Sequence, residues 1–386
     1  MEGVTRRDWM GMAAAGAVVA GISGSAHAAT DMDSLDALAK AKGFVGFGSC
    51  IGGGAEDFAS SFSDSGVRGI HERECGIAVC ENETKWVALR PNPREYSFYL
   101  ADRVVDWAQS HAMMMRGHTL LWNKTQYFPK WLQNYDFGAR PASEAERMLR
   151  EHITTVCTHF GTRIFTYDVV NETVDEETGE MRQSPFTKFL GDATIDICFD
   201  AAHKAAPHAR LVYNDYMGWG AGSARHRDGV LKLLQRLKAN KAPVHLLGVQ
   251  SHIGPGNNVE SQGSNTFNAA DQASWKQFLD SVVALDLRLA LTEFDVSERG
   301  TPGDIAVRDR EMADLTRRYL DFMFAYKQTD YLMAWGMMDH YSWLQNFYGT
   351  RPDGMLKRPS LYDDNYQPKP MRQAIADAFR NAPMRA

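Results

Sequence analysis

The chain lacks the features that mark nucleotide, nucleic-acid and membrane proteins. Its 386 residues carry a net charge of −6, so no basic field attracts nucleic acid or anionic lipid. No Gly-x-Gly-x-x-Gly turn follows a first strand-like segment, and Gly52-Gly53-Gly54 precedes acidic residues that would repel phosphate. No apolar run of 18 residues occurs beyond the N-terminal region. The composition, 44% hydrophobic and 23% charged, is that of a globular protein and is compatible with a neutral polymer such as a polysaccharide as partner.

The first 28 residues predict a cleavable export signal rather than part of the fold. Arg6-Arg7 precedes the small apolar run Gly11–Ile22, and Ala26-His27-Ala28 is similar to a signal-peptidase site. The paired arginines resemble a twin-arginine signal; an ordinary secretory signal and an uncleaved anchor are the alternatives. We therefore predict a signal over residues 1–28, one folded domain over residues 29–386, and a periplasmic or extracellular location without membrane attachment after cleavage.

The cysteines offer neither a metal site nor a disulfide framework. No C-x-x-C or His-rich spacing occurs, so a zinc site is not expected, and an odd number cannot pair completely within the chain. Twin-arginine cargo folds in a reducing compartment, which predicts buried free thiols. A bridge between Cys75 and Cys80 formed later is the alternative. The five residues are Cys50, Cys75, Cys80, Cys157 and Cys198.

Strand-like and helix-like segments alternate through the rest of the chain. Eight such units without a break in composition predict an α/β fold, a single (β/α)8 TIM barrel; an open doubly wound sheet is the alternative. The longer connections, Ile253–Asn268 and Asn346–Tyr366, follow strands, on the face where barrels build their sites. The predicted strands are Phe44–Cys50, Gly76–Glu81, Met113–His118, Ile164–Asn171, Arg210–Asn214, Leu246–Ser251, Leu289–Glu293 and Tyr331–Gly336.

Two of these strands stop abruptly at a glutamate, Glu172 and Glu293. A buried parallel strand with this pattern delivers a carboxylate to the mouth of a barrel. Two such carboxylates in a tryptophan-rich chain suggest cleavage of a glycosidic bond, in which one donates a proton and the other, ionised, attacks the sugar. Two unrelated glutamates held in salt bridges are the alternative interpretation.

Nearly every predicted strand ends in polar or aromatic groups, and together these motifs resemble glycoside hydrolase family 10, the endo-β-1,4-xylanases. The resemblance covers about Phe44–Phe379, nearly all of the predicted domain. One motif alone is weak evidence, whereas seven in the correct order on the correct strands are specific. The motifs are Glu81-Asn82-x-x-Lys85-Trp86, Arg116-Gly117-His118-Thr119-Leu120-x-Trp122, Asp168-Val169-Val170-Asn171-Glu172, Asn214-Asp215-Tyr216, Gln250-Ser251-His252, Thr292-Glu293-x-Asp295 and Trp335-Gly336-x-x-Asp339-x-x-Ser342-Trp343.

The resemblance implies a role for each matching residue. Glu172 would be the general acid/base and Glu293 the nucleophile, while Asn171 would bind the 2-hydroxyl of the sugar at the cleavage point. His252 would bridge Glu293 and Asp295, and this hydrogen bonding should keep Glu293 ionised. Asp339 is left out as a structural partner. The residues expected to bind substrate are Glu81, Asn82, Lys85, His118, Trp122, Gln250, Trp335 and Trp343.

Three positions depart from the family pattern. Asn123 stands where histidine is usual, Tyr167 replaces a tryptophan, and the segment 123–129 is longer, so that the family's glutamine cannot be placed on Gln126. None of these changes removes a catalytic carboxylate. We expect them to alter the pocket beside it, and Asn123→His to shift the limbs of the pH–activity profile.

These observations predict a monomeric, retaining endo-acting xylanase whose partner is a polysaccharide or oligosaccharide. A related barrel hydrolase acting on another β-1,4-glycan, such as a cellulase or glucanase, and an inactive sugar-binding barrel remain as alternatives. No cofactor and no metal is implied, because a proton donor and a carboxylate nucleophile suffice for the reaction.

Overall fold

The computed structural model describes residues 33–52, 60–254, 267–298, 301, 303–347, 349–351 and 353–385. The predicted export signal and most of the loop Ile253–Asn268 lie outside the described residues. The description below concerns the unit Ser34–Ala386.

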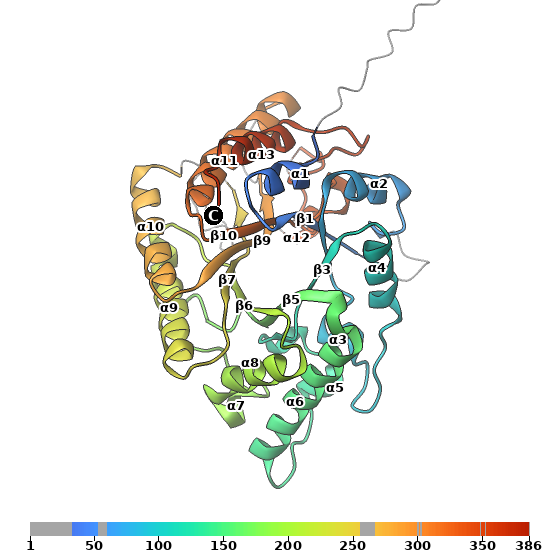
Figure 1. Ribbon diagram of the computed structural model, residues 1–386, viewed down its shortest axis with the longest axis vertical. Helices are drawn as coiled ribbons and strands as arrows, with labels where there is room; N and C mark the ends of the chain where they lie inside the picture. Colours follow the sequence, from blue (N-terminus) through green and yellow to red (C-terminus); the bar gives the residue numbers. More distant parts are fainter. Residues whose placement is uncertain are drawn as a thin grey trace, which may run out of the picture. The chain divides into compact units, whose positions relative to one another are not determined.

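Parallel strands form a closed barrel in this part of the chain, with helices outside it (Figure 1). The strands follow one another in chain order, and the last, β10, pairs with both β1 and β9, which closes the ring. This closure confirms the predicted (β/α)8 barrel and excludes the open sheet. The ring consists of β1 (Gly46–Ile51), β2 (Ile77–Cys80), β3 (Met114–Gly117), β5 (Ile164–Asn171), β6 (Arg210–Asp215), β7 (Leu246–Val249), β9 (Arg288–Val296) and β10 (Thr329–Ala334).

Two short strands extend this framework at its carboxyl end. β4 (Leu121–Trp122) pairs with β5, and β8 (His252–Ile253) pairs with β9. Each predicted strand overlaps an observed one, but β9 continues past the predicted end at Glu293 because β8 supplies it with hydrogen-bonding partners. The two additions carry side chains of the predicted site, Trp122 and His252.

The helices are amphipathic elements that bury one face against the barrel. In α6, buried residues recur at helical spacing, among them Leu149, Ile153, Val156 and Phe160. Helices occur between the strands, as the alternation of helix-like and strand-like segments predicted, and α1 precedes the first strand. The helices of the described chain are α1 (Leu35–Ala41), α2 (Ser65–Glu74), α3 (Trp86–Leu89), α4 (Tyr99–Ser110), α5 (Lys130–Gln133), α6 (Pro141–Phe160), α7 (Thr187–Leu190), α8 (Ala193–Ala205), α9 (Ala224–Ala239), α10 (Ala269–Val283), α11 (Ile305–Ala325), α12 (Leu344–Phe347) and α13 (Pro370–Asn381).

The strands are buried on both faces, as expected for a parallel barrel. Close packing also sets narrow limits on the outer face of the barrel, where a Cβ on Gly117 would clash with the ring of Tyr167. All five cysteines are buried and free, which confirms the expected thiols; Cys75 and Cys80 are not bridged. Among the described helices, none combines the length and the apolar character that crossing a membrane requires.

Candidate active site

A cavity of about 770 Å³ opens at the carboxyl ends of the strands and contains almost all of the predicted site residues. Asp295 is the exception and lies behind the wall. Four further side chains line the cavity that the sequence analysis did not assign to it, namely Lys124, Tyr127, Tyr216 and Phe347. The expected residues in its wall are Glu81, Asn82, Lys85, His118, Trp122, Asn171, Glu172, Gln250, His252, Glu293, Trp335 and Trp343.

Glu293, on β9, is buried among positively charged groups. Its carboxylate lies 3.9 Å from Nδ1 of His118 and 3.4 Å from Nε2 of His252. Burial opposes ionisation, but the charge of His118, the hydrogen bond and charge of His252, and Arg116 together lower the pKa of Glu293 to about 2. These neighbours therefore favour the ionised form of Glu293.

His252 is itself held by a second carboxylate. Its Nδ1 lies 2.9 Å from Asp295, which also accepts a hydrogen bond of 2.7 Å from the indole Nε1 of Trp343. Burial disfavours a charged imidazole, but Asp295 and Glu293 raise the pKa of His252 well above its usual value. The bridging arrangement that the family resemblance implied is thus present, and Trp343 takes part in it as well as forming a wall.

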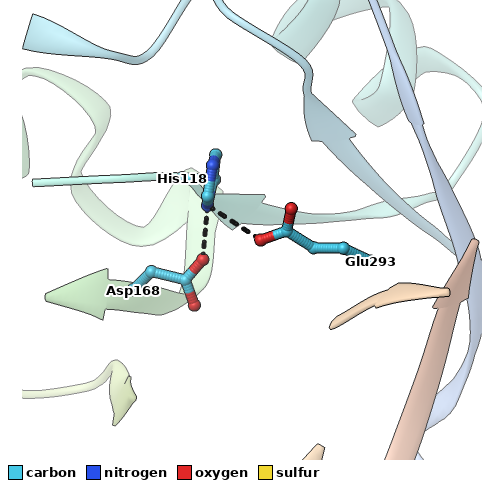
Figure 2. A group of neighbouring side chains, drawn as sticks. All are labelled: His118, Asp168 and Glu293. Carbon is cyan, nitrogen blue, oxygen red and sulfur yellow. Dashed lines mark hydrogen bonds and ion pairs between the residues drawn. The ribbon is translucent and has the colours of Figure 1, made fainter. Parts of the chain in front are cut away.

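The side chains of His118, which follows β3, Asp168 on β5 and Glu293 on β9 form a second cluster (Figure 2). Their ligand atoms lie within 4.8 Å of one another, which is a spacing that a metal ion could use. The donor set does not fit a cation, however, because the guanidinium of Arg116 already binds the same oxygen of Asp168 as His118 does. We interpret the cluster as support for Glu293.

Glu172 lies at the end of β5 in a different environment. Its φ of 53° is in the left-handed region, a conformation that costs about 1–3 kcal/mol for a residue with a side chain and is common at functional sites. A backbone hydrogen bond of 2.9 Å from Glu172 to Asn214 fixes it. Its carboxylate accepts hydrogen bonds from Trp122 at 3.0 Å and Gln250 at 2.8 Å, and pairs with the ammonium of Lys124 at 2.6 Å.

Three side-chain amides connect the two glutamates. Oδ1 of Asn171 accepts from Asn214 at 2.9 Å and from Gln250 at 3.2 Å. Asn214 also donates to Glu293 at 2.7 Å, and Gln250 to Glu172. The two carboxylates are thus held by one continuous network across β5, β6 and β7.

The other end of the cavity presents groups suited to sugar hydroxyls. Lys85 donates to Asn82 at 2.9 Å and lies 4.8 Å from the centre of the Trp122 ring. Burial raises the pKa of Glu81 to about 7, against the opposing effect of Lys85. Trp335 meets His118 edge to face, with ring centres 5.3 Å apart. A few polar groups beside aromatic walls are typical of pockets that bind small molecules.

Of the three departures from the family pattern, the longer segment 123–129 reaches the cavity through Lys124 and Tyr127, whereas the other two do not. Asn123 is buried and donates to Thr173, and Tyr167 packs between the barrel and α6, beside Cys157; neither lines the cavity. The expectation that they alter the pocket directly is therefore wrong, because both side chains turn away from it. Lys124, the next residue after Asn123, is the one that enters the cavity. Gln126 is exposed and lines an adjacent hollow.

Several supporting residues were missed, although their motifs were recognised. Asn214 and Asp168 belong to the strand-end motifs, and that position alone could have marked them. Lys124 and Tyr127 lie in a segment without a regular pattern, so the sequence offered no signal for them. Asp339 accepts from Lys369 at 2.8 Å and from the backbone of Ser360, which agrees with a structural role.

Comparisons with known proteins agree with this geometry. Residues 34–378 match the family described as Glycosyl hydrolase family 10. The exoglucanase XynX of Acetivibrio thermocellus is 32% identical over 80% of the chain, which spans only 26% of that protein. The endo-1,4-beta-xylanase B of Paenibacillus barcinonensis is 30% identical over 75% of the chain and 85% of its own length. The crystal structure of xylanase 10B from Thermotoga petrophila with xylobiose has a TM-score of 0.76 and 27% identity, and the match covers 90% of this chain and 97% of that one.

Proposed function

The chain belongs to glycosyl hydrolase family 10, and from this premise we propose that Glu172 and Glu293 cleave β-1,4-xylosidic bonds by double displacement. The activity is that of a retaining endo-β-1,4-xylanase with an oligosaccharide or polysaccharide substrate. The observation that carries the assignment of roles is the contrast between the two carboxylates. Glu293 is held ionised by His118, His252 and Arg116, as a nucleophile must be.

In the first step, a carboxylate oxygen of Glu293 attacks the anomeric carbon while Glu172 transfers its proton to the leaving oxygen. The glycosidic bond breaks and a glycosyl ester of Glu293 forms. In the second step, Glu172 removes a proton from water, and the water oxygen displaces Glu293 from the same carbon. Two inversions restore the β configuration. Asn171 contacts both carboxylates through the amide network and is suited to hold the 2-hydroxyl between them.

The deciding experiment combines a substrate panel with product stereochemistry. Initial rates on xylan, mixed-linkage glucan and cello-oligosaccharides should favour xylan, and an NMR time course should show the β-anomer first. Equal rates on cello-oligosaccharides would support the glucanase alternative. An α-anomer formed first would contradict the double displacement.

We further propose that the enzyme is an exported monomer. Residues 1–28 carry paired arginines and an apolar run, which supports twin-arginine export. N-terminal sequencing of enzyme recovered outside the cytoplasm should begin at Ala29, and Arg6→Lys with Arg7→Lys should retain the precursor in the cell. Export of the double variant at an unchanged rate would favour an ordinary secretory signal. Light scattering of the mature enzyme measures its mass in solution.

A further inference from the structure

Lys124 lies where the catalytic cavity meets a second, polar hollow. It lines both spaces, and the hollow has a volume of about 880 Å³. Only 16% of its side chain is exposed. Its ammonium contacts Glu172 at 2.6 Å and lies 4.5 Å from the centre of the Tyr216 ring. The ammonium also lies 3.4 Å from the hydroxyl of Tyr216. In the proposed mechanism Glu172 gives its proton to the leaving oxygen, so a sugar attached to that oxygen would lie near Lys124.

The hydrogen bonds of Glu172 are those of an ionised carboxylate. One carboxylate oxygen of Glu172 accepts a hydrogen bond from Trp122 and pairs with the ammonium of Lys124. The other oxygen accepts hydrogen bonds from Gln250 and Asn171. All four partners are donors, and a carboxylate has about four acceptor sites. The protonated form required for the first step would add a fifth hydrogen, directed at the leaving oxygen. One donor must therefore move away before the reaction begins.

Lys124 is the donor that is free to move. The indole of Trp122 stacks on Tyr127 with ring centres 3.7 Å apart, and the two amides are fixed by the network between the strands. The lysine stem is flexible and has the hollow beside it.

Protonation of Glu172 leaves this lysine without a counterion. Glu172 is the only carboxylate that pairs with it in the described part of the chain. Of the acids near it, Asp175 and Glu176 are already bound to Arg182, and Glu177, which also lines the hollow, is exposed. A mostly buried ammonium without an anion is unfavourable, so a carboxylate supplied by the substrate would stabilise the reactive state.

We propose that Lys124 binds a uronic acid branch of the glycan on the leaving-group side, so that the enzyme prefers acidic to neutral xylan. The inference rests on the proposed function, and it makes Lys124 a specificity-determining residue. In the bound complex the substrate carboxylate replaces the charge that Glu172 loses when it takes up its proton.

The test compares two xylo-oligosaccharides of equal length: one with a single glucuronic acid branch, and the same compound with its carboxyl group reduced to an alcohol. At pH 6 the wild type should give a kcat/KM ratio of about tenfold or more in favour of the acid, as expected for a hydrogen bond between charged groups. Lys124→Met should bring the ratio close to one, while Lys124→Arg should keep most of it. The matched control is Lys85→Met, which removes the other cavity lysine and should lower both rates without changing the ratio.

Mass spectrometry should place the branch on the leaving fragment. A wild-type ratio of one or less, or the same ratio in Lys124→Met, would overturn the proposal. If Lys124→Met has no measurable turnover, calorimetry with the two oligosaccharides on Glu293→Ala and on Glu293→Ala/Lys124→Met decides it: loss of the preference for the acid supports the proposal, and its persistence contradicts it. A wild type that cleaves neither compound would instead contradict the proposed function. The same calorimetry would still show whether Lys124 binds the acidic branch.

Discussion

Glu172 and Glu293 face the same cavity, yet their partners differ in kind. Glu293 is surrounded by charged groups that are themselves held by other buried carboxylates, Asp168 and Asp295. Glu172 accepts hydrogen bonds from three neutral groups, the indole of Trp122 and two side-chain amides. Its one cationic partner is Lys124, whose side chain is flexible. The first environment lowers the pKa of Glu293 and favours its ionised form, whereas the second combines neutral donors with a single cation. This difference is what a nucleophile and an acid/base require of a protein.

Replacing each glutamate by alanine should produce the largest effects and should separate the two environments. Glu293→Ala should abolish turnover of every substrate, by about 10⁴-fold or more, because no glycosyl ester can form. Glu172→Ala should lose about 10²–10⁴-fold on xylan but keep the first step on aryl xylosides with good leaving groups, which need no proton. Burst kinetics on both substrates measures this, and equal losses on the aryl substrate would contradict the assignment.

A third buried carboxylate, Glu74, shows how a purely structural group should behave. It accepts from Arg372 at 3.0 Å and from the backbone of Leu35, and so links α1, α2 and α13 far from the cavity. Arg372→Met should lower the free energy of unfolding by about 3 kcal/mol, because the buried carboxylate loses its closest cation and keeps only Tyr362, Leu35 and the more distant Arg73 as partners. The control is Arg380→Met on the same helix, whose exposed pair with Asp377 should contribute less than about 1 kcal/mol. Urea unfolding measures both, and equal losses would refute the distinction.

Removing His252 should make the surroundings of Glu293 less positively charged, and so more like those of Glu172. His252→Ala takes away a positive charge and a hydrogen bond, so the pKa of Glu293 should rise from about 2. Because Glu293 acts when ionised, activity should then be lost at a higher pH on the acid side. We expect kcat/KM at neutral pH to fall by roughly 10–100-fold from the lost orientation of the carboxylate. A pH–kcat/KM profile checks this, and an acid limb that does not move would show that His252 has no electrostatic role.

The smallest effect on the chemistry should come from Asn123→His. The side chain is buried against Thr173 and does not reach the cavity, so both limbs of the pH profile should stay in place. The larger ring should instead lower the free energy of unfolding by about 1–3 kcal/mol through overpacking. If the limbs of the pH–kcat/KM profile move and the free energy of unfolding does not change, the shift expected from the sequence would be correct.

The regular parts of the molecule could be predicted because their signals are local. Buried strands read as apolar runs, and a polar residue where such a run stops marks the mouth of the barrel; this located Glu172, Glu293 and their neighbours. The orientation of side chains in the segment 123–129 could not be predicted, since no periodicity shows that Asn123 turns inward and Lys124 faces the cavity. The short strands β4 and β8 were also missed, because two residues are too few to form a pattern.

The backbone at the mouth of the barrel has a further consequence for how such an enzyme can change. A ladder of main-chain hydrogen bonds runs from Glu172 to Asn214, from Gln250 to Asp215, and from Glu293 to Gln250. The path between Glu172 and Glu293 crosses the ends of β5, β6, β7 and β9 without passing through a long connecting loop. The register of these strands therefore sets the distance between the carboxylates of Glu172 and Glu293. The loops above it are free to be exchanged, and the choice of substrate can change while the spacing that the chemistry needs is inherited intact.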